Sequence, residues 1–126
     1  MKKFLFVILM IISTCVVNAQ VLNFRTTSFS KKVGSSWGSW QESSLNITMD
    51  LNNDIVTIYS PKIQMYKIYS NVSNYYDSDG DYNMNFKFID QDGDQGTMTL
   101  LQRTNGRSEI YIRFRNIQWC YVVRRL

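Results

Sequence analysis

The sequence predicts an all-β protein with one small antiparallel meander of about eight strands. Two observations carry this prediction. Apolar and polar residues alternate with a period of two along most of the chain, and no segment of useful length has helical periodicity. Turn signals built from Asn, Asp and Gly separate the alternating runs. Such a meander closes into a barrel or folds into a sandwich. We favour the closed barrel, because closure leaves no exposed sheet edge.

The first half of the chain gives four candidate strands. Leu22 and Phe24 share one face of the first strand, and Lys31–Gly38 follows it as a polar loop of Ser and Gly. An Asn-Asn-Asp turn separates the next two strands, and Pro61, the only proline, separates the last two. The predicted ranges are Val21–Ser30, Ser43–Asp50, Ile55–Ser60 and Lys62–Ser70.

The second half gives four more strands after a long polar loop, Asn71–Asp81. The clearest alternation begins at Tyr82 and places Phe86 and Phe88 on one face. Asn105-Gly106 predicts a hairpin with a type I′ turn, which needs φ > 0 at both central positions. The other predicted strands are Gly96–Arg103, Ser108–Arg115 with Ile110 and Ile112 inward, and Ile117–Arg124 with Trp119 and Tyr121 on one face.

The first residues have the layout of a secretory signal peptide. Lys2 and Lys3 precede an apolar run that is too short to span a membrane, and a small-residue exit ends at Ala19. We therefore expect residues 1–19 to be removed and residues 20–126 to form one exported domain, which is periplasmic, outer-surface or secreted. Cys15 offers a second reading as the lipidated first residue of a lipoprotein, although Thr14 fits that motif poorly.

Composition excludes several classes of function. Without Lys2 and Lys3, 12 of the 14 basic residues remain against 10 acidic ones, and a net charge of +2 argues against a nucleic-acid partner. Histidine is absent, so the chain lacks the residue that most hydrolytic active sites use. It also has no glycine loop of the kind that binds the phosphates of nucleotides. Cys120 is the only cysteine after the leader and is expected to pack as a small buried hydrophobe. We therefore expect no catalytic activity.

Two acidic turns are the candidate metal sites. Asp77, Asp79 and Asp81 place carboxylates at alternate positions, and Asp90, Asp92 and Asp94 repeat the arrangement. Calcium is bound by such oxygen ligands, but the EF-hand order of Gly and Glu is missing. The two interpretations are plain hairpin turns, which we favour, and a calcium cage at Asp77, Asp79 and Asp81. No other cofactor is expected.

Aromatic and basic residues give a candidate contact surface. Arg113 and Arg115 lie two apart on a predicted strand and would project from one face with Tyr111. Trp37 and Trp40 flank Gly38-Ser39 in the first loop. Arg, Tyr and Trp are enriched at the centres of interfaces, so these five residues are the candidate binding residues. Solvated arginines and a tryptophan lid over one barrel end are the alternative interpretation.

Parts of the sequence resemble a known group of proteins. They are the leader end Asn18-Ala19-Gln20, the run Trp37-Gly38-Ser39-Trp40-Gln41, the segments Ile47–Asp50 and Ile58–Ser60 with Gln64 and Tyr66, and the ending Tyr111…Trp119…Tyr121. Together they resemble short secreted proteins of unknown function from gut Bacteroidetes. The resemblance implies an exported bacterial β-domain and assigns no catalytic residue.

We therefore expect an exported, non-enzymatic binding module, and two versions compete. In one version the outer face contacts a protein or glycan partner through the candidate binding residues. In the other, a calycin-like barrel carries an apolar or amphipathic ligand among Met84, Phe86, Phe88, Met98 and Leu100. We prefer the outer-face version, because side chains usually fill the interior of a small barrel. The sequence leaves ligand identity, biological process and oligomeric state open.

Overall fold

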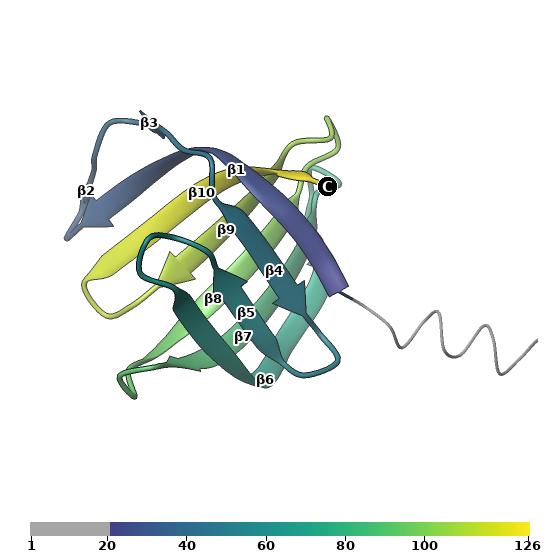
Figure 1. Ribbon diagram of the computed structural model, residues 1–126. Coiled ribbons are helices and arrows are strands. Elements are labelled where there is room, and N and C mark those ends of the chain that lie inside the picture. The colour runs from purple at the N-terminus through teal and green to yellow at the C-terminus, as the bar shows by residue number, and fades with distance from the viewer. Residues whose placement is uncertain (1–20) are drawn as a thin grey trace, which may run out of the picture.

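The computed structural model describes residues 21–126, which form ten β-strands and no helix (Figure 1). The strands are β1 Val21–Val33, β2 Ser36–Trp37, β3 Gln41–Glu42, β4 Asn46–Asp50, β5 Ile55–Ile58, β6 Gln64–Tyr76, β7 Tyr82–Asp90, β8 Gln95–Gln102, β9 Ser108–Arg113 and β10 Ile117–Arg125. Within this range no helix is long and apolar enough to cross a membrane. The predicted leader and Cys15 lie outside the described residues.

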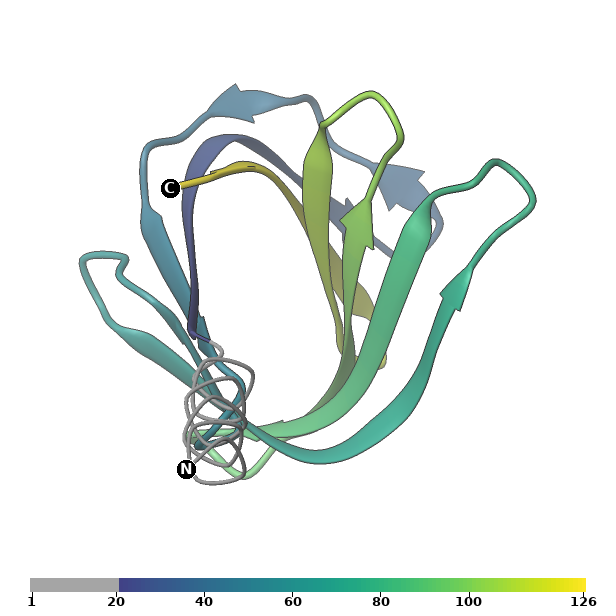
Figure 2. The same ribbon diagram turned by 90° about the vertical axis from the view of Figure 1, so that its right-hand side faces the viewer.

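Eight of the strands close into an antiparallel barrel. The sheet runs β10-β9-β8-β7-β6-β5-β4-β1, and pairing of β10 with β1 completes the ring (Figure 2). β2 and β3 are short additions that pair only with β1. All eight predicted strands are present, and the preference for a barrel over a sandwich is confirmed.

The barrel interior is filled by the inward residue of each alternating pair. Phe24, Phe88, Met98, Leu100 and Ile112 have no exposed surface. Phe88 lies at the centre of an aromatic cluster, with ring centroids 4.9 Å from Tyr66 and 5.3 Å from Phe114, both edge to face. Such pairs contribute about 0.5–1.5 kcal/mol beyond the area they bury. The alternation in the sequence therefore identifies the core.

β6 is longer than predicted, and the expected loop Asn71–Asp81 is wrong. The strand continues through Tyr76 and pairs with β7 from Tyr66 to Tyr76, so only the turn at 77–81 is irregular. Two register shifts, at Tyr69 and Val72, interrupt the alternation. Each shift moves the following residues to the other face, which hides the strand from a period-two search.

Three hairpins of the barrel use the same turn. The turns at 77–81, 90–94 and 103–107 each have two backbone hydrogen bonds in the same pattern and a glycine with φ of 82–88° at their fourth residue. This is the three-residue hairpin loop, a type I turn followed by a left-handed residue. The type I′ turn predicted at Asn105-Gly106 is therefore wrong, because among these residues only Gly106 has positive φ.

Gly96 is required by the close approach of two strands. A Cβ atom there would lie 2.4 Å from the Arg113 carbonyl oxygen and 2.6 Å from the Phe88 ring. We expect Gly96→Ala to lower the free energy of unfolding by about 1–3 kcal/mol through overpacking. Urea denaturation measures this loss. Thr97→Ala, at an exposed neighbouring position, is the control, and equal stabilities of the two variants would contradict the close approach.

Candidate functional site

The segment between β1 and β4 lies along β1 and is fastened to it by backbone and side-chain bonds. The Gly38 amide donates to the Lys31 carbonyl oxygen at 2.7 Å, and the Ser30 hydroxyl donates to the Gly38 carbonyl oxygen at 2.8 Å. We call residues 34–45 the strap. Figure 1 shows it beside β1, at the upper left of the barrel. The polar loop predicted at Lys31–Gly38 is thus partly strand, and β3 was not expected.

A row of outward side chains passes beneath the strap. Ser30 pairs with Cys120, and Cys120 pairs with Tyr111. Because Tyr121 and Trp119 pack with the barrel core, Cys120 between them faces outward. Residues directly opposite on neighbouring strands share a face, so the row crosses the outer wall of β1, β10 and β9.

The strap and this row line an open pocket of about 360 Å³ on the outer wall. Its lining residues are Ser30, Trp37, Gly38, Trp40, Tyr111 and Cys120. Trp37 and Trp40 are 44% and 53% exposed, so both indoles are accessible to a partner. Three of the five predicted binding residues, Trp37, Trp40 and Tyr111, therefore line one pocket, although Tyr111 is far from the two tryptophans in sequence.

Arg113 does not line this pocket, although it follows Tyr111 on the same outer face of β9 and is half-buried. Its guanidinium carbon is 5.1 Å from the centre of the Tyr111 ring, and its Nη1 donates to the Thr99 hydroxyl oxygen at 2.7 Å. Burial lowers the pKa of Arg113 from its ordinary value. None of the ion pairs formed by residues 21–126 includes Arg113. It is therefore a partly desolvated cation held by a neutral hydrogen bond and an aromatic ring.

Arg115 does not belong to this group. β9 ends at Arg113, and Arg115 is an exposed residue of the turn between β9 and β10. It lines pockets at the end of the barrel, next to Asn116 and Ile117. The expectation that Arg113 and Arg115 project from one strand face is therefore wrong, because the strand ends between them.

Two lining residues were missed by sequence reasoning. Cys120 was predicted to be a small buried residue, and it is 2% exposed, but it lies on the outer face as the pocket floor. Burial raises the pKa of its thiol to about 11, so the thiol stays protonated at neutral pH. Ser30 lies among the polar residues of β1 and carries no signal of its own. The alternation Trp119-Cys120-Tyr121 was the available sign that Cys120 faces outward.

A second polar cluster joins two hairpins at one end of the barrel. Glu109 is 3% exposed and is bonded by Arg103, while the Tyr111 hydroxyl donates to the same carboxylate at 2.9 Å. Arg103 also reaches the buried Asp81 at 3.5 Å, and Asp81 accepts the Thr104 amide at 2.9 Å. We call Asp81, Arg103, Arg107 and Glu109 the charge cluster.

The charge cluster contains a buried carboxylate, as an acid–base site does, but the pKa of that carboxylate is shifted in the direction expected of a structural ion pair. Burial raises the pKa of Glu109, but hydrogen bonds from Arg103 and Tyr111 and the charges of Arg103 and Arg107 outweigh it, so the net pKa lies below its ordinary value. A general acid needs the opposite shift. The cluster thus supports a role in joining the hairpins.

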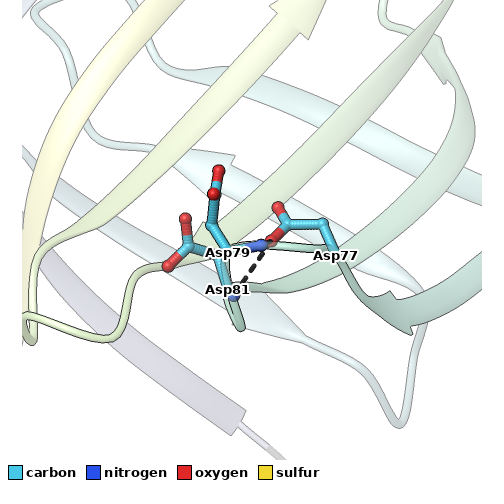
Figure 3. A group of neighbouring side chains, drawn as sticks. All are labelled: Asp77, Asp79 and Asp81. Carbon is cyan, nitrogen blue, oxygen red and sulfur yellow. Dashed lines mark hydrogen bonds between the residues drawn. The ribbon is translucent and has the colours of Figure 1, made fainter.

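The first acidic turn has two of its three carboxylates, those of Asp77 and Asp81, engaged within the protein, while that of Asp79 is exposed (Figure 3). One Asp77 oxygen accepts the amides of Asp79 and Asp81 at 3.0 and 3.1 Å, and the other accepts the Asn83 amide. These bonds, led by the one from Asn83, lower the pKa of Asp77. Asp81 belongs to the charge cluster. Carboxylate oxygens of the three aspartates come within 4.8 Å of one another, but Arg103 already supplies a cation there.

We expect calcium to leave the stability of the protein unchanged. Asp90 repeats the turn pattern of Asp77, accepting the amides of Asp92 and Asp94 at 2.9 Å, which is the function of Asp in this hairpin. Thermal melts in millimolar calcium and in chelator should therefore coincide. A higher melting temperature in calcium, abolished by Asp79→Ala, would support the calcium cage instead.

An open pocket of about 350 Å³ lies at the end of the barrel that holds the β4–β5 turn. It includes the apolar Leu51, Ile68, Met84 and Phe86, together with polar residues such as Asp54 and Asn71. Met98 and Leu100 do not line it and are fully buried in the core. The fold is thus compatible with a binding or a carrier module.

Comparison with known proteins gives no relatives. No family model matches the chain, and neither a curated protein nor a solved structure matches it. The resemblance to secreted Bacteroidetes proteins therefore stays a prediction. The class of protein defined here is a closed eight-stranded β-barrel with a tryptophan-lined pocket on its outer wall.

Proposed function

We propose that this protein is an exported, non-enzymatic binding module that holds its partner in the pocket under the strap. The convergence of Trp37, Trp40 and Tyr111 on one pocket carries the proposal. Exposed apolar residues that gather in one place mark interaction sites, and Trp and Tyr are enriched where partners bind. The filled interior favours the outer wall over the barrel centre as the binding site.

The carrier version ranks second. Its supporting observation is the open pocket that includes Met84 and Phe86. Polar residues form much of the lining of that pocket, which is poorly suited to an apolar ligand. Growth of this pocket would require moving fully buried core residues.

Binding is tested by comparing the tagged protein with a Trp37→Ala/Trp40→Ala variant, on a mixed glycan array and in a pull-down from the cell-surface fraction. We expect the variant to lose the captured partner and to keep the wild-type melting temperature. A Tyr59→Ala/Tyr75→Ala variant removes two other exposed aromatics that line neither this pocket nor the one with Met84 and Phe86, and it is the matched control. Equal capture by all three proteins would reject the pocket.

Export is tested by determining the first residue of the protein recovered outside the cytoplasm. Cleavage of the leader after Ala19 leaves Gln20 first, whereas a lipoprotein begins at a modified Cys15. Retention of the intact chain in the cytoplasm would contradict the proposed localisation.

A further inference from the structure

We propose that the free edge of β6 binds an extended segment of another protein, which adds one antiparallel strand to the sheet and places a basic side chain beside Asp54. This site is separate from the pocket under the strap, so the inference goes beyond the proposed function. Three features carry it: an uncovered strand edge, a pocket along that edge and an unpaired acid at one end of it.

Two strands of the barrel are much longer than their neighbours on one side. β1 pairs with β4 only through residues 21–25, and β6 pairs with β5 only through residues 64–67. The strap covers the rest of the β1 edge, where β3 pairs with Ser28 and Phe29, and β2 pairs with Lys32 and Val33. The fold thus already uses an extended segment to cover one such overhang.

The overhang of β6 has no such cover. The Ile68 amide donates to the Asp54 carbonyl oxygen at 2.7 Å, and β7 pairs with residues 69–76 on one side. No other strand of residues 21–126 pairs with this stretch, and Figure 2 shows it, in teal, beside β7 alone. Roughly half of the amide and carbonyl groups of a strand point to each side, so this edge presents a row of free donors and acceptors.

This edge lacks most of the features that protect exposed edges from pairing. Natural edge strands carry charged side chains, proline or bulges. Residues 68–76 contain neither a charged side chain nor a proline, so the two register shifts at Tyr69 and Val72 are the only such feature. Val72 and Tyr76 are 54% and 74% exposed. The stretch is therefore suited to pairing with a strand that follows its twist.

The open pocket of about 350 Å³ lies along the same edge. Much of its lining belongs to β6, from Ile68 to Asn74, and Leu51, Met84 and Phe86 add apolar surface. Alternate side chains of a strand point to the same face, so an added strand would place every second side chain over this pocket. Peptides that add to a sheet edge gain affinity from main-chain hydrogen bonds and specificity from such pockets. The mixed lining suits small β-branched side chains such as Val and Thr.

Asp54 sets the charge expected of the partner and the end at which that charge lies. It is the only charged residue that lines the pocket, and it takes part in none of the ion pairs formed by residues 21–126. Lys67, the nearest cation along β6, lies between two buried residues and therefore faces outward. β5 runs antiparallel to β6 from Ile55, so a segment that continues the line of β5 along residues 69–76 has its C-terminal end next to Asp54. A Lys or Arg at that end of the partner would pair with the Asp54 carboxylate.

The test selects peptides from a display library of random decapeptides with the full chain as bait, and calorimetry measures the affinity of the enriched peptides. We expect the enriched sequences to alternate Val, Ile or Thr with polar residues and to carry Lys or Arg at the C-terminal end. Methylation of every second peptide nitrogen, on the side that faces β6, should weaken binding more than about 10-fold, because it removes main-chain hydrogen bonds. Methylation of the other set of nitrogens, which faces solvent, is the control.

Two further measurements locate the bound peptide. Hydrogen–deuterium exchange should slow at the amides of residues 69–76 and stay unchanged in the strap. Asp54→Asn suits a position with φ of 56° and should weaken peptides that end in Lys about two- to fivefold, the size expected of an exposed ion pair. Asp92→Asn, in another acidic turn that does not line the pocket, is the matched control and should bind as the wild type does.

Each remaining outcome overturns strand addition at β6. Enrichment of no peptide, or equal binding of the two methylated forms, would reject it outright. Protection of residues 34–45 in place of 69–76 would put the peptide under the strap. A concentration-dependent dimer that protects residues 69–76 and excludes the peptide would make a second copy of the chain the partner. The expected peptide keeps its affinity for the Trp37→Ala/Trp40→Ala variant, so this proposal and the proposed function fail independently of each other.

Discussion

Replacement of Phe88 by alanine is expected to lower the free energy of unfolding by about 3–5 kcal/mol. Phe88 has no exposed surface, and its ring packs edge to face with Tyr66 and Phe114. Alanine would remove both aromatic contacts and leave a cavity in the barrel interior. Small domains have total stabilities of about 5–15 kcal/mol, so this loss is a large share of the whole.

The measurement is a shift of the urea midpoint at constant slope. Tyr69→Ala is the control, because Tyr69 is 53% exposed on the neighbouring strand β6 and should cost less than about 0.5 kcal/mol. Phe88→Leu should lie between them. A midpoint for Phe88→Ala that matches the Tyr69→Ala value would mean that the interior around Phe88 is not packed as described.

Removal of the Arg103 side chain is expected to lower the free energy of unfolding by about 2–3 kcal/mol. Glu109 is 3% exposed and would lose its main cationic partner. Breaking a fully buried pair costs about 3–5 kcal/mol. The expected loss is smaller here, because the Arg103 side chain is 37% exposed and Arg107 stays within 3.7 Å of the carboxylate. Arg103→Ala measures this loss by urea denaturation. Arg124→Ala, at an exposed position of β10, should be neutral.

The charge cluster also predicts the direction of the pH dependence. The pKa of Glu109 in the folded protein lies below the ordinary value of 4.5. Its contribution is therefore complete above the unfolded pKa and is lost as the pH falls through the folded pKa. We expect the stability of the wild type to fall below about pH 4.5, and Glu109→Gln to flatten part of this fall. Parallel pH profiles of the two proteins would contradict the ionised state of Glu109.

The period-two pattern was enough to predict the barrel and its core. Phe86, Ile110 and Ile112 were placed inward from alternation alone, and all three are buried. Where the pattern is interrupted, the prediction was wrong. β6 contains two register shifts, so Asn71 lies opposite the inward Phe86, where uninterrupted alternation from Ile68 would have placed Ser70.

The site was predicted in its residue types but not in its geometry. Trp37, Trp40 and Tyr111 were named because of their chemistry, and their convergence depends on strand register, which a single sequence does not specify. The end of β9 at Arg113 separates that residue from Arg115. Burial of Asp81 and Glu109 depends on two hairpins meeting, and charged residues give no sign of that in the sequence.

Closure of the barrel has a consequence for the order of folding. β6 to β10 pair with their neighbours in the chain, whereas Phe24 pairs with Arg125 across almost the full length of the described residues. Local pairings form quickly, and a contact of such high sequence separation forms slowly. The pairing of β1 with β10 should therefore form last. Until it forms, the unpaired edges of these two strands are open to self-association. Concentration-dependent refolding yields, improved by dilution, would be the visible sign of that vulnerable intermediate.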